Sequence, residues 1–189
     1  NDAAAGTGAR TVLIEGLDGS YNAISETITL TGQTAVNTTN TYLRVQHITV
    51  ATAGSGGVNA GTIYVGTGTV TAGVPAVIHE LAPAGFNTEL SGAYTVPAGY
   101  TAYLYQGGMS SQSNGNNFIT ATLRFSNQGS PWQTPAVTVF TADMVDYNFT
   151  YPLVLPEKTD IEARATVSAG TSIATSFFFI VLIKNDGQP

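Results

Sequence analysis

Apolar side chains alternate with Ser, Glu and Thr along Ile24-Ser25-Glu26-Thr27-Ile28-Thr29-Leu30. The same period of two recurs in Asp160-Ile161-Glu162-Ala163-Arg164-Ala165-Thr166-Val167. Successive side chains of a β-strand point to opposite faces of a sheet, so this period predicts strands with one buried and one wet face. Such strands are typical of antiparallel sheets. The two stretches therefore predict an all-β, antiparallel fold.

Further strands are predicted where Thr, Val, Ile, Tyr and Phe dominate a run, because these residues fit a pleated surface. The runs are residues 11–17, 42–51, 61–65, 76–81, 100–106, 118–125, 136–140, 147–155 and 171–183. No segment repeats apolar residues at helical spacing over a dozen positions, and residues 142–146 are expected to form a turn at most.

The turn residues favour a sandwich. Asp18-Gly19 is a strong hairpin signal between two runs. Pro97 and Pro156 each precede an alternating run and mark corners where a new strand begins. We therefore expect an antiparallel β-sandwich of jelly-roll or Greek-key type over residues 11–189, with an extended N-terminal arm over residues 1–10. The alternative is two β subdomains that meet near residue 85.

Charge is scarce in this chain of 189 residues. Only 10% of the residues are charged, against roughly 25% in an average soluble domain. The net charge of −6 and the scattered basic residues disfavour nucleic-acid binding. No apolar run is long enough to span a bilayer. There is no Cys, so disulfides, thiolate metal sites and Cys nucleophiles are excluded.

The scarcity of charge bears on the sheet edges, which monomeric β-proteins protect with Lys, Pro or other devices. Residues 11–17 and 177–183 are the expected edge strands, and they contain almost none of these residues. We expect other copies of the chain, or the N-terminal arm, to cover them. An arm of this kind could add a strand to a neighbour. Its candidate assembly residues are Asn1, Asp2, Gly6, Gly8 and Arg10.

A resemblance is carried by Gly6-Thr7-Gly8-Ala9-Arg10-Thr11-Val12-Leu13-Ile14-Glu15-Gly16-Leu17-Asp18 and by its continuation from Tyr21 to Leu30. Leu43-Arg44-Val45 and the stretch from Ala51 to Gly57 extend it over about the first third of the chain. This part resembles uncharacterised β-rich, jelly-roll-like structural proteins encoded by phages and related elements of aquatic bacteria. The resemblance implies a repeated, non-enzymatic subunit of a virion part or an extracellular filament.

No sequence motif indicates catalysis, a cofactor or a metal. His47 and His79 are interpreted as ordinary strand residues, because His79 and Glu80 point to opposite faces of a strand and no zinc motif is present. The Asp18-Gly19 turn could supply oxygen ligands to calcium, but a plain turn is favoured. Glu15 and Glu26 could face each other across two strands, and we expect a wet face or pairing with Arg10 or Arg44 instead.

Two sets of surface residues suggest contacts with sugars. Tyr103, Tyr105 and Trp132 could form a platform on which a glycan stacks, although a core or subunit interface is favoured for them. Asn37 and Asn148 each begin an N-glycosylation pattern.

The expected function is a non-enzymatic structural subunit that forms homo-polymers outside the cell or in a virion, as a filament, tail appendage or capsid component. A carbohydrate-binding or receptor-binding module, with cell-surface or attached glycans as partners, is the alternative. A hydrolase on a sandwich scaffold has the least support.

Overall fold

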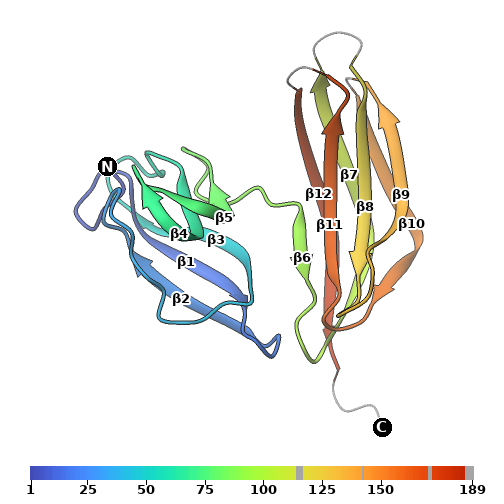
Figure 1. Cartoon of the computed structure of the whole chain (residues 1–189), viewed down its shortest axis with the longest axis horizontal. Coiled ribbons are helices and arrows are strands. Elements are labelled where there is room, and N and C mark those ends of the chain that lie inside the picture. The colour runs from blue at the N-terminus through green and yellow to red at the C-terminus, as the bar shows by residue number, and fades with distance from the viewer. Residues whose placement is uncertain (114–116, 142, 170–171, 186–189) are drawn as a thin grey trace. The chain divides into compact units, whose positions relative to one another are not determined.

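The computed structural model describes residues 1–113, 117–141, 143–169 and 172–185. These residues form twelve β-strands and no helix, and all the strand pairs are antiparallel (Figure 1). The all-β, antiparallel prediction is confirmed. Within the described ranges, no helix is long and apolar enough to cross a membrane.

The chain divides into two compact units, unit 1 (Asn1–Ser91) and unit 2 (Gly92–Pro189). Strands of each unit pair only with strands of the same unit in the part of the chain that is described. The division differs from the single sandwich expected over residues 11–189 and lies close to the alternative boundary near residue 85.

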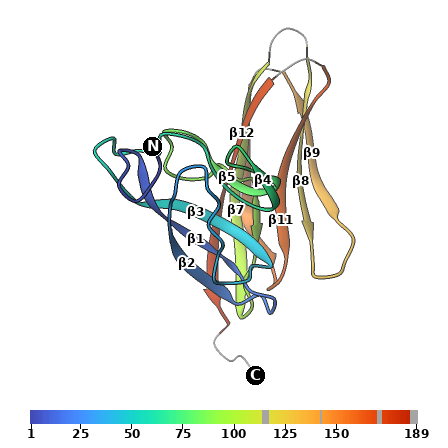
Figure 2. The same cartoon turned by 60° about the vertical axis from the view of Figure 1, so that its left-hand side comes forward.

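Unit 1 combines a three-stranded sheet of order β2-β1-β3 with the hairpin β4–β5 (Figure 2). Its strands are β1 (Ala9–Leu17), β2 (Ala23–Thr29), β3 (Arg44–Ala53), β4 (Ile63–Thr71) and β5 (Val74–Ala82). The core joins sheet and hairpin through Ala9, Val12, Ile14, Ile48, Ile63 and Ala82. Burial of these apolar side chains is the main force that holds the hairpin on the sheet.

Strand β1 is the centre of its sheet, so the expectation that residues 11–17 form an edge is wrong. Ile14 lies opposite Glu26 of β2 and Ile48 of β3. The low charge of this strand fits its position between two neighbouring strands and its buried side chains.

Residues 1–8 fold back onto unit 1, whereas an extended arm was expected. The Asp2 carboxylate accepts the backbone N–H groups of Ala9, Ala60 and Gly61 at 2.7, 2.8 and 2.7 Å. A Cβ at Gly8 would lie 2.3 Å from Asp2 Oδ1, so the fold-back requires glycine there. Three charge-assisted hydrogen bonds favour the docked segment over a free arm.

The other proposed arm residues also make contacts inside the chain. The Asn1 carbonyl accepts the Gly8 N–H at 3.3 Å, and the Gly6 carbonyl accepts Arg10 Nε–H at 3.0 Å. Ala3 forms an isolated antiparallel bridge with Thr31. The assembly arm of residues 1–10 is therefore corrected to a docked N-terminal segment.

Unit 2 is a sandwich of two sheets, with strand orders β10-β7-β12 and β6-β11-β8-β9 (Figure 1). The strands are β6 (Ala93–Thr95), β7 (Tyr100–Ser113), β8 (Ile119–Ser126), β9 (Gln133–Phe140), β10 (Met144–Leu155), β11 (Asp160–Val167) and β12 (Ser172–Lys184). Leu104 of β7 and Ile161 of β11 belong to one buried cluster. A second cluster includes Met109, Ile119, Ala121 and Phe140.

Several local expectations are confirmed. Asp18-Gly19 lies in the β1–β2 hairpin, Pro97 precedes β7 and Pro156 precedes β11. Strand β12, which contains residues 177–183, ends its sheet as expected for an edge. Residue 142, which begins the expected turn at 142–146, lies outside the described residues, and β10 begins at Met144. The jelly-roll or Greek-key type of the sandwich stays a prediction.

Candidate functional site

The expected aromatic platform is divided between two sheets of unit 2. Tyr103 and Tyr105 flank Leu104, which is fully buried, so both tyrosines lie on the outer face of β10-β7-β12. Trp132 precedes β9, and its ring lies under the Arg124 guanidinium of β8 at 4.6 Å from the centroid. The two tyrosines therefore stay together, and Trp132 belongs to the other sheet.

The outer face near Trp132 is polar and internally paired. Arg124 donates from Nε and Nη2 to one oxygen of Glu162, at 2.9 and 2.5 Å. Arg164 pairs with the other oxygen of the same carboxylate. Ion pairs at a surface contribute little to stability, but they satisfy the charges of this sheet within one copy of the chain. Arg124 also covers the Trp132 ring, which leaves less of it for a sugar.

The outer face of β10-β7-β12 is apolar. Register places Val154 of β10 and Val181 of β12 on either side of Tyr103. Val154 is 55% exposed, Val181 48% and Ile183 51%. We define the outer apolar face as Tyr103, Tyr105, Val154, Val181 and Ile183. Residues 100–106, 153–155 and 178–183, which carry it, include no Asp, Glu, Lys or Arg.

Such a face is unusual for a protein that acts as a monomer. Scattered exposed apolar residues are normal, whereas contiguous apolar patches mark interaction surfaces. One row of the outer apolar face, Val154–Tyr103–Val181, spans all three strands of its sheet in register, whereas the register shifts at Tyr105 on both sides. It is therefore a surface of unit 2 that could bury apolar area against another molecule.

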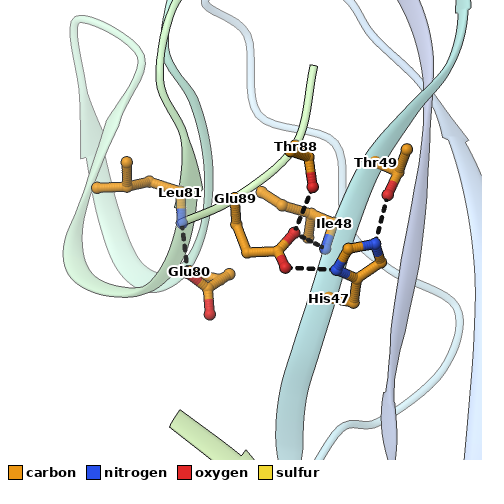
Figure 3. Close-up of polar contacts among 7 residues, drawn as sticks. All are labelled: His47, Ile48, Thr49, Glu80, Leu81, Thr88 and Glu89. Atoms are coloured by element: carbon orange, nitrogen blue, oxygen red, sulfur yellow. Dashed lines mark hydrogen bonds and ion pairs between the residues drawn. The ribbon is translucent and has the colours of Figure 1, made fainter. Parts of the chain in front are cut away.

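A polar cluster in unit 1 connects β3 to the segment after β5 (Figure 3). His47 Nδ1 pairs with Glu89 Oε1, and Thr49 Oγ1 lies 2.7 Å from His47 Nε2. The second oxygen of Glu89 accepts the Ile48 N–H at 2.8 Å and the Thr88 hydroxyl at 3.2 Å. Backbone bonds join the same segments, with Glu89 N–H donating to the Ile48 carbonyl at 3.2 Å.

This succession of Thr49, His47 and Glu89 has the order of nucleophile, base and acid in hydrolases. In it, His47 could take the Thr49 proton while Glu89 holds the ring. Acyl transfer also needs donors aimed at a developing oxyanion, and the described contacts of the cluster include none. They fasten residues 87–89 to β3, which is a structural role. Sequence reasoning missed Glu89 as the partner of His47, since no local pattern connects positions 42 residues apart.

His79 and Glu80 are adjacent on β5 and differ in burial, and the register with β4 shifts at His79, since Glu80 lies opposite Val65 and Ile78 opposite Gly66. His79 contacts Thr67 across the hairpin at 3.1 Å, whereas Glu80 is only 9% exposed. Burial raises the pKa of Glu80, and the hydrogen bond from the Leu81 N–H works against this rise. The charged form of Glu80 therefore disfavours folding of unit 1 at neutral pH.

Glu80→Gln is expected to raise the unfolding temperature of unit 1 at pH 7. A raised pKa in the folded state means that the carboxylate costs stability above that pKa, and that the cost vanishes below the unfolded value of about 4.3. The advantage of the variant should therefore shrink as pH falls toward about 4. Calorimetry across this range measures it, with exposed Glu15→Gln as control. An advantage that grows on acidification would contradict the assignment.

The Asp18-Gly19 turn, considered above as a calcium site, is held by hydrogen bonds within the turn itself. Asp18 accepts the backbone N–H groups of Ser20 and Asn22 at 2.8 and 2.9 Å, and hydrogen bonds from Asn22 lower its pKa. No group of three or more His, Cys, Asp or Glu side chains in the described ranges could hold a metal ion. The calcium alternative thus finds no further acidic ligands there.

The two glutamates of the β1–β2 hairpin do not face each other. Ile14, and not Glu15, lies opposite Glu26. Glu15 is exposed, in line with the expected wet face. Glu26 accepts the backbone N–H groups of Thr39 and Asn40 at 2.9 and 3.2 Å.

The two N-glycosylation patterns lie in different settings. Asn37 is exposed in the loop between β2 and β3, and Asn148 is exposed within β10 opposite Gln106. Modification at either position stays a prediction.

Comparison of this chain with protein-family models, with curated proteins and with solved structures gives no match.

Proposed function

We propose that this protein is a non-enzymatic structural subunit that assembles with copies of itself, outside the cell or in a virion, through the outer apolar face of unit 2. The observation that carries the proposal is the row Val154–Tyr103–Val181, which is in register across three strands and free of charged neighbours. Burial of such a face is favourable by about 25 cal/mol per Å².

Two further features support assembly over catalysis. The polar side chains that could do chemistry, His47 with Glu89 and Arg124 with Glu162, are engaged in contacts inside their own units. The small fraction of charged residues leaves few charged groups to be taken out of water when copies of the chain pack together.

Val154→Lys is expected to weaken assembly by at least about tenfold in concentration. Loss of one buried valine costs about 1.5–3 kcal/mol, and each 1.4 kcal/mol is a factor of about ten. Light scattering on a sizing column over a dilution series measures this change, and electron microscopy of stained samples shows the assembly itself.

Val139→Lys is the matched control. Val139 is 58% exposed on β9 of the other sheet, so this variant carries the same added charge and should assemble normally. A wild-type chain that stays monomeric up to its solubility limit would overturn the proposal.

A carbohydrate-binding or receptor-binding module is the second candidate, because Tyr103 and Tyr105 share the outer face and Tyr105 is 46% exposed. Aromatic faces of this kind stack on sugar rings. Glycan-array binding that is lost in Tyr105→Ala would favour this candidate over assembly.

A further inference from the structure

In the described part of unit 2, four strands lie at sheet edges, and three of them carry a feature that discourages pairing with another chain. Strand β9 includes Pro135 and strand β10 includes Pro152, and proline cannot donate to a sheet ladder. Strand β6 spans only Ala93–Thr95, too short to serve as a template. Proline and short length are the usual means of protecting sheet edges.

The fourth edge, β12, lacks these features. It runs over thirteen residues, includes no proline and has Lys184, its last residue, as its one charged residue. It pairs with β7 from Ser172 opposite Ser113 to Lys184 opposite Tyr100. The register of this pairing shifts once, between Phe179 and Ile180. A long edge strand with no proline and almost no charge is a ready template for one more strand.

The physical character of β12 points to a second copy of itself as the occupant. In an antiparallel pair of identical strands the two Lys184 side chains lie at opposite ends, so no like charges face each other. A partner strand that carries charge would find no opposite charge between residues 172 and 183. Val181 and Ile183 of β12 also belong to the outer apolar face, so pairing of two copies would join both faces into one surface.

We propose that β12 pairs antiparallel with β12 of a second copy across a twofold axis, which makes one six-stranded sheet from two β10-β7-β12 sheets. This inference rests on the proposed function and names the first contact of the assembly. A contact of this type is self-complementary and closed, so it gives a dimer as the building block. Larger assemblies then form through the joined apolar faces.

A single-cysteine scan tests the pairing. The chain has no cysteine, so one introduced at each position of β12 in turn is the sole thiol of that variant. Directly opposite residues in an antiparallel pair have Cα atoms about 4.5–5.5 Å apart, within the range that a disulfide bridges. In an antiparallel pair of identical strands, a residue lies opposite its own copy only at the twofold axis. We therefore expect oxidative cross-linking in a narrow window of one to three consecutive positions.

Controls separate this inference from the proposed function. Val139→Cys on β9 gives the background of random collision, and Trp132 fluorescence verifies that each variant is folded. Val181→Lys added to the best cross-linking variant should reduce its cross-link at least tenfold. Cross-linking at alternate positions along the whole strand would indicate parallel pairing and overturn the inference.

Assembly without cross-linking above the Val139→Cys background would also overturn the edge pairing, while the proposed function stands. If the chain does not assemble and no position cross-links above this background, both the edge pairing and the proposed function are overturned.

Discussion

Asn59→Leu is expected to destabilise unit 1 by about 3 kcal/mol or more. Asn59 is only 1% exposed, and its side-chain nitrogen donates to the carbonyls of Gly61 and Pro83 at 2.9 and 2.8 Å. Its backbone N–H donates to Asn87 Oδ1, and its own Oδ1 accepts the Asn87 N–H, both at 2.9 Å. This network joins the loop before β4 to the segment after β5.

Leucine has the branched shape of asparagine and keeps the backbone N–H that donates to Asn87 Oδ1, but its side chain makes none of the other three hydrogen bonds. It would leave two partly buried carbonyls and the Asn87 N–H without this partner, and each such loss costs about 1–3 kcal/mol when the group is buried. A unit of about 90 residues is stable by only about 5–14 kcal/mol. The variant should therefore lose a large part of the stability of unit 1.

Hydrogen exchange detected by mass spectrometry on peptides from residues 1–91 measures this loss. Asn37→Leu, in an exposed loop, is the matched control and should exchange as the wild type does. Asn87→Gly removes the side-chain amide of Asn87, and glycine tolerates the positive φ of 61° at this position. This variant should lose an intermediate amount of protection from exchange. If these peptides are protected from exchange equally in Asn59→Leu and in the wild type, the network does not stabilise the unit.

Leu104→Ala is expected to destabilise unit 2 by about 2–5 kcal/mol. Leu104 is fully buried at the centre of the β10-β7-β12 sheet, opposite Leu153 and Ile180. It belongs to the cluster that joins the two sheets of the sandwich. Alanine removes the contacts of the deleted atoms and leaves a cavity, and the packed side chains around it can collapse only partly to fill it.

Trp132 is the single tryptophan of the chain and lies in unit 2, so its fluorescence follows the unfolding of that unit in urea. With a slope of about 1–3 kcal/mol per molar urea, the midpoint should fall by about 1–3 M. Val137→Ala on β9, where the side chain is 58% exposed, should change the midpoint little. A fall of the same size in both variants would mean that burial of Leu104 is not the cause.

Much of the fold could be predicted because strands and turns depend on neighbouring residues. The alternation in residues 24–30 predicts a strand, and the Asp18-Gly19 dipeptide predicts a hairpin turn. Both signals depend only on residues a few positions away, and both predictions are confirmed. Whether a strand lies at the edge of a sheet is not a local property, because it depends on which other strands pair with it. Residues 11–17 have the same neutral character as β12, yet β3 pairs with them and makes them central.

The candidate site was only partly predictable for the same reason. Tyr103 and Tyr105 share a face because of the strand period, but no pattern indicates that Val154 and Val181 lie beside Tyr103. Asp2 could not be predicted to bind the N–H groups of Ala60 and Gly61, 58 and 59 residues away. Without that contact, residues 1–10 have the composition of a free arm.

The sequence by itself determined the all-β class, the positions of the hairpins and corners, and the shortage of charge along β12, because backbone conformation and side-chain alternation are local properties. Only the tertiary structure decided that the chain forms two units, that β1 is central and β12 an edge, and that Asp2, Glu89 and Asn59 have distant partners. Those outcomes depend on strand pairing and core packing between segments far apart in the chain. No local pattern specifies which pairing buries the most apolar surface.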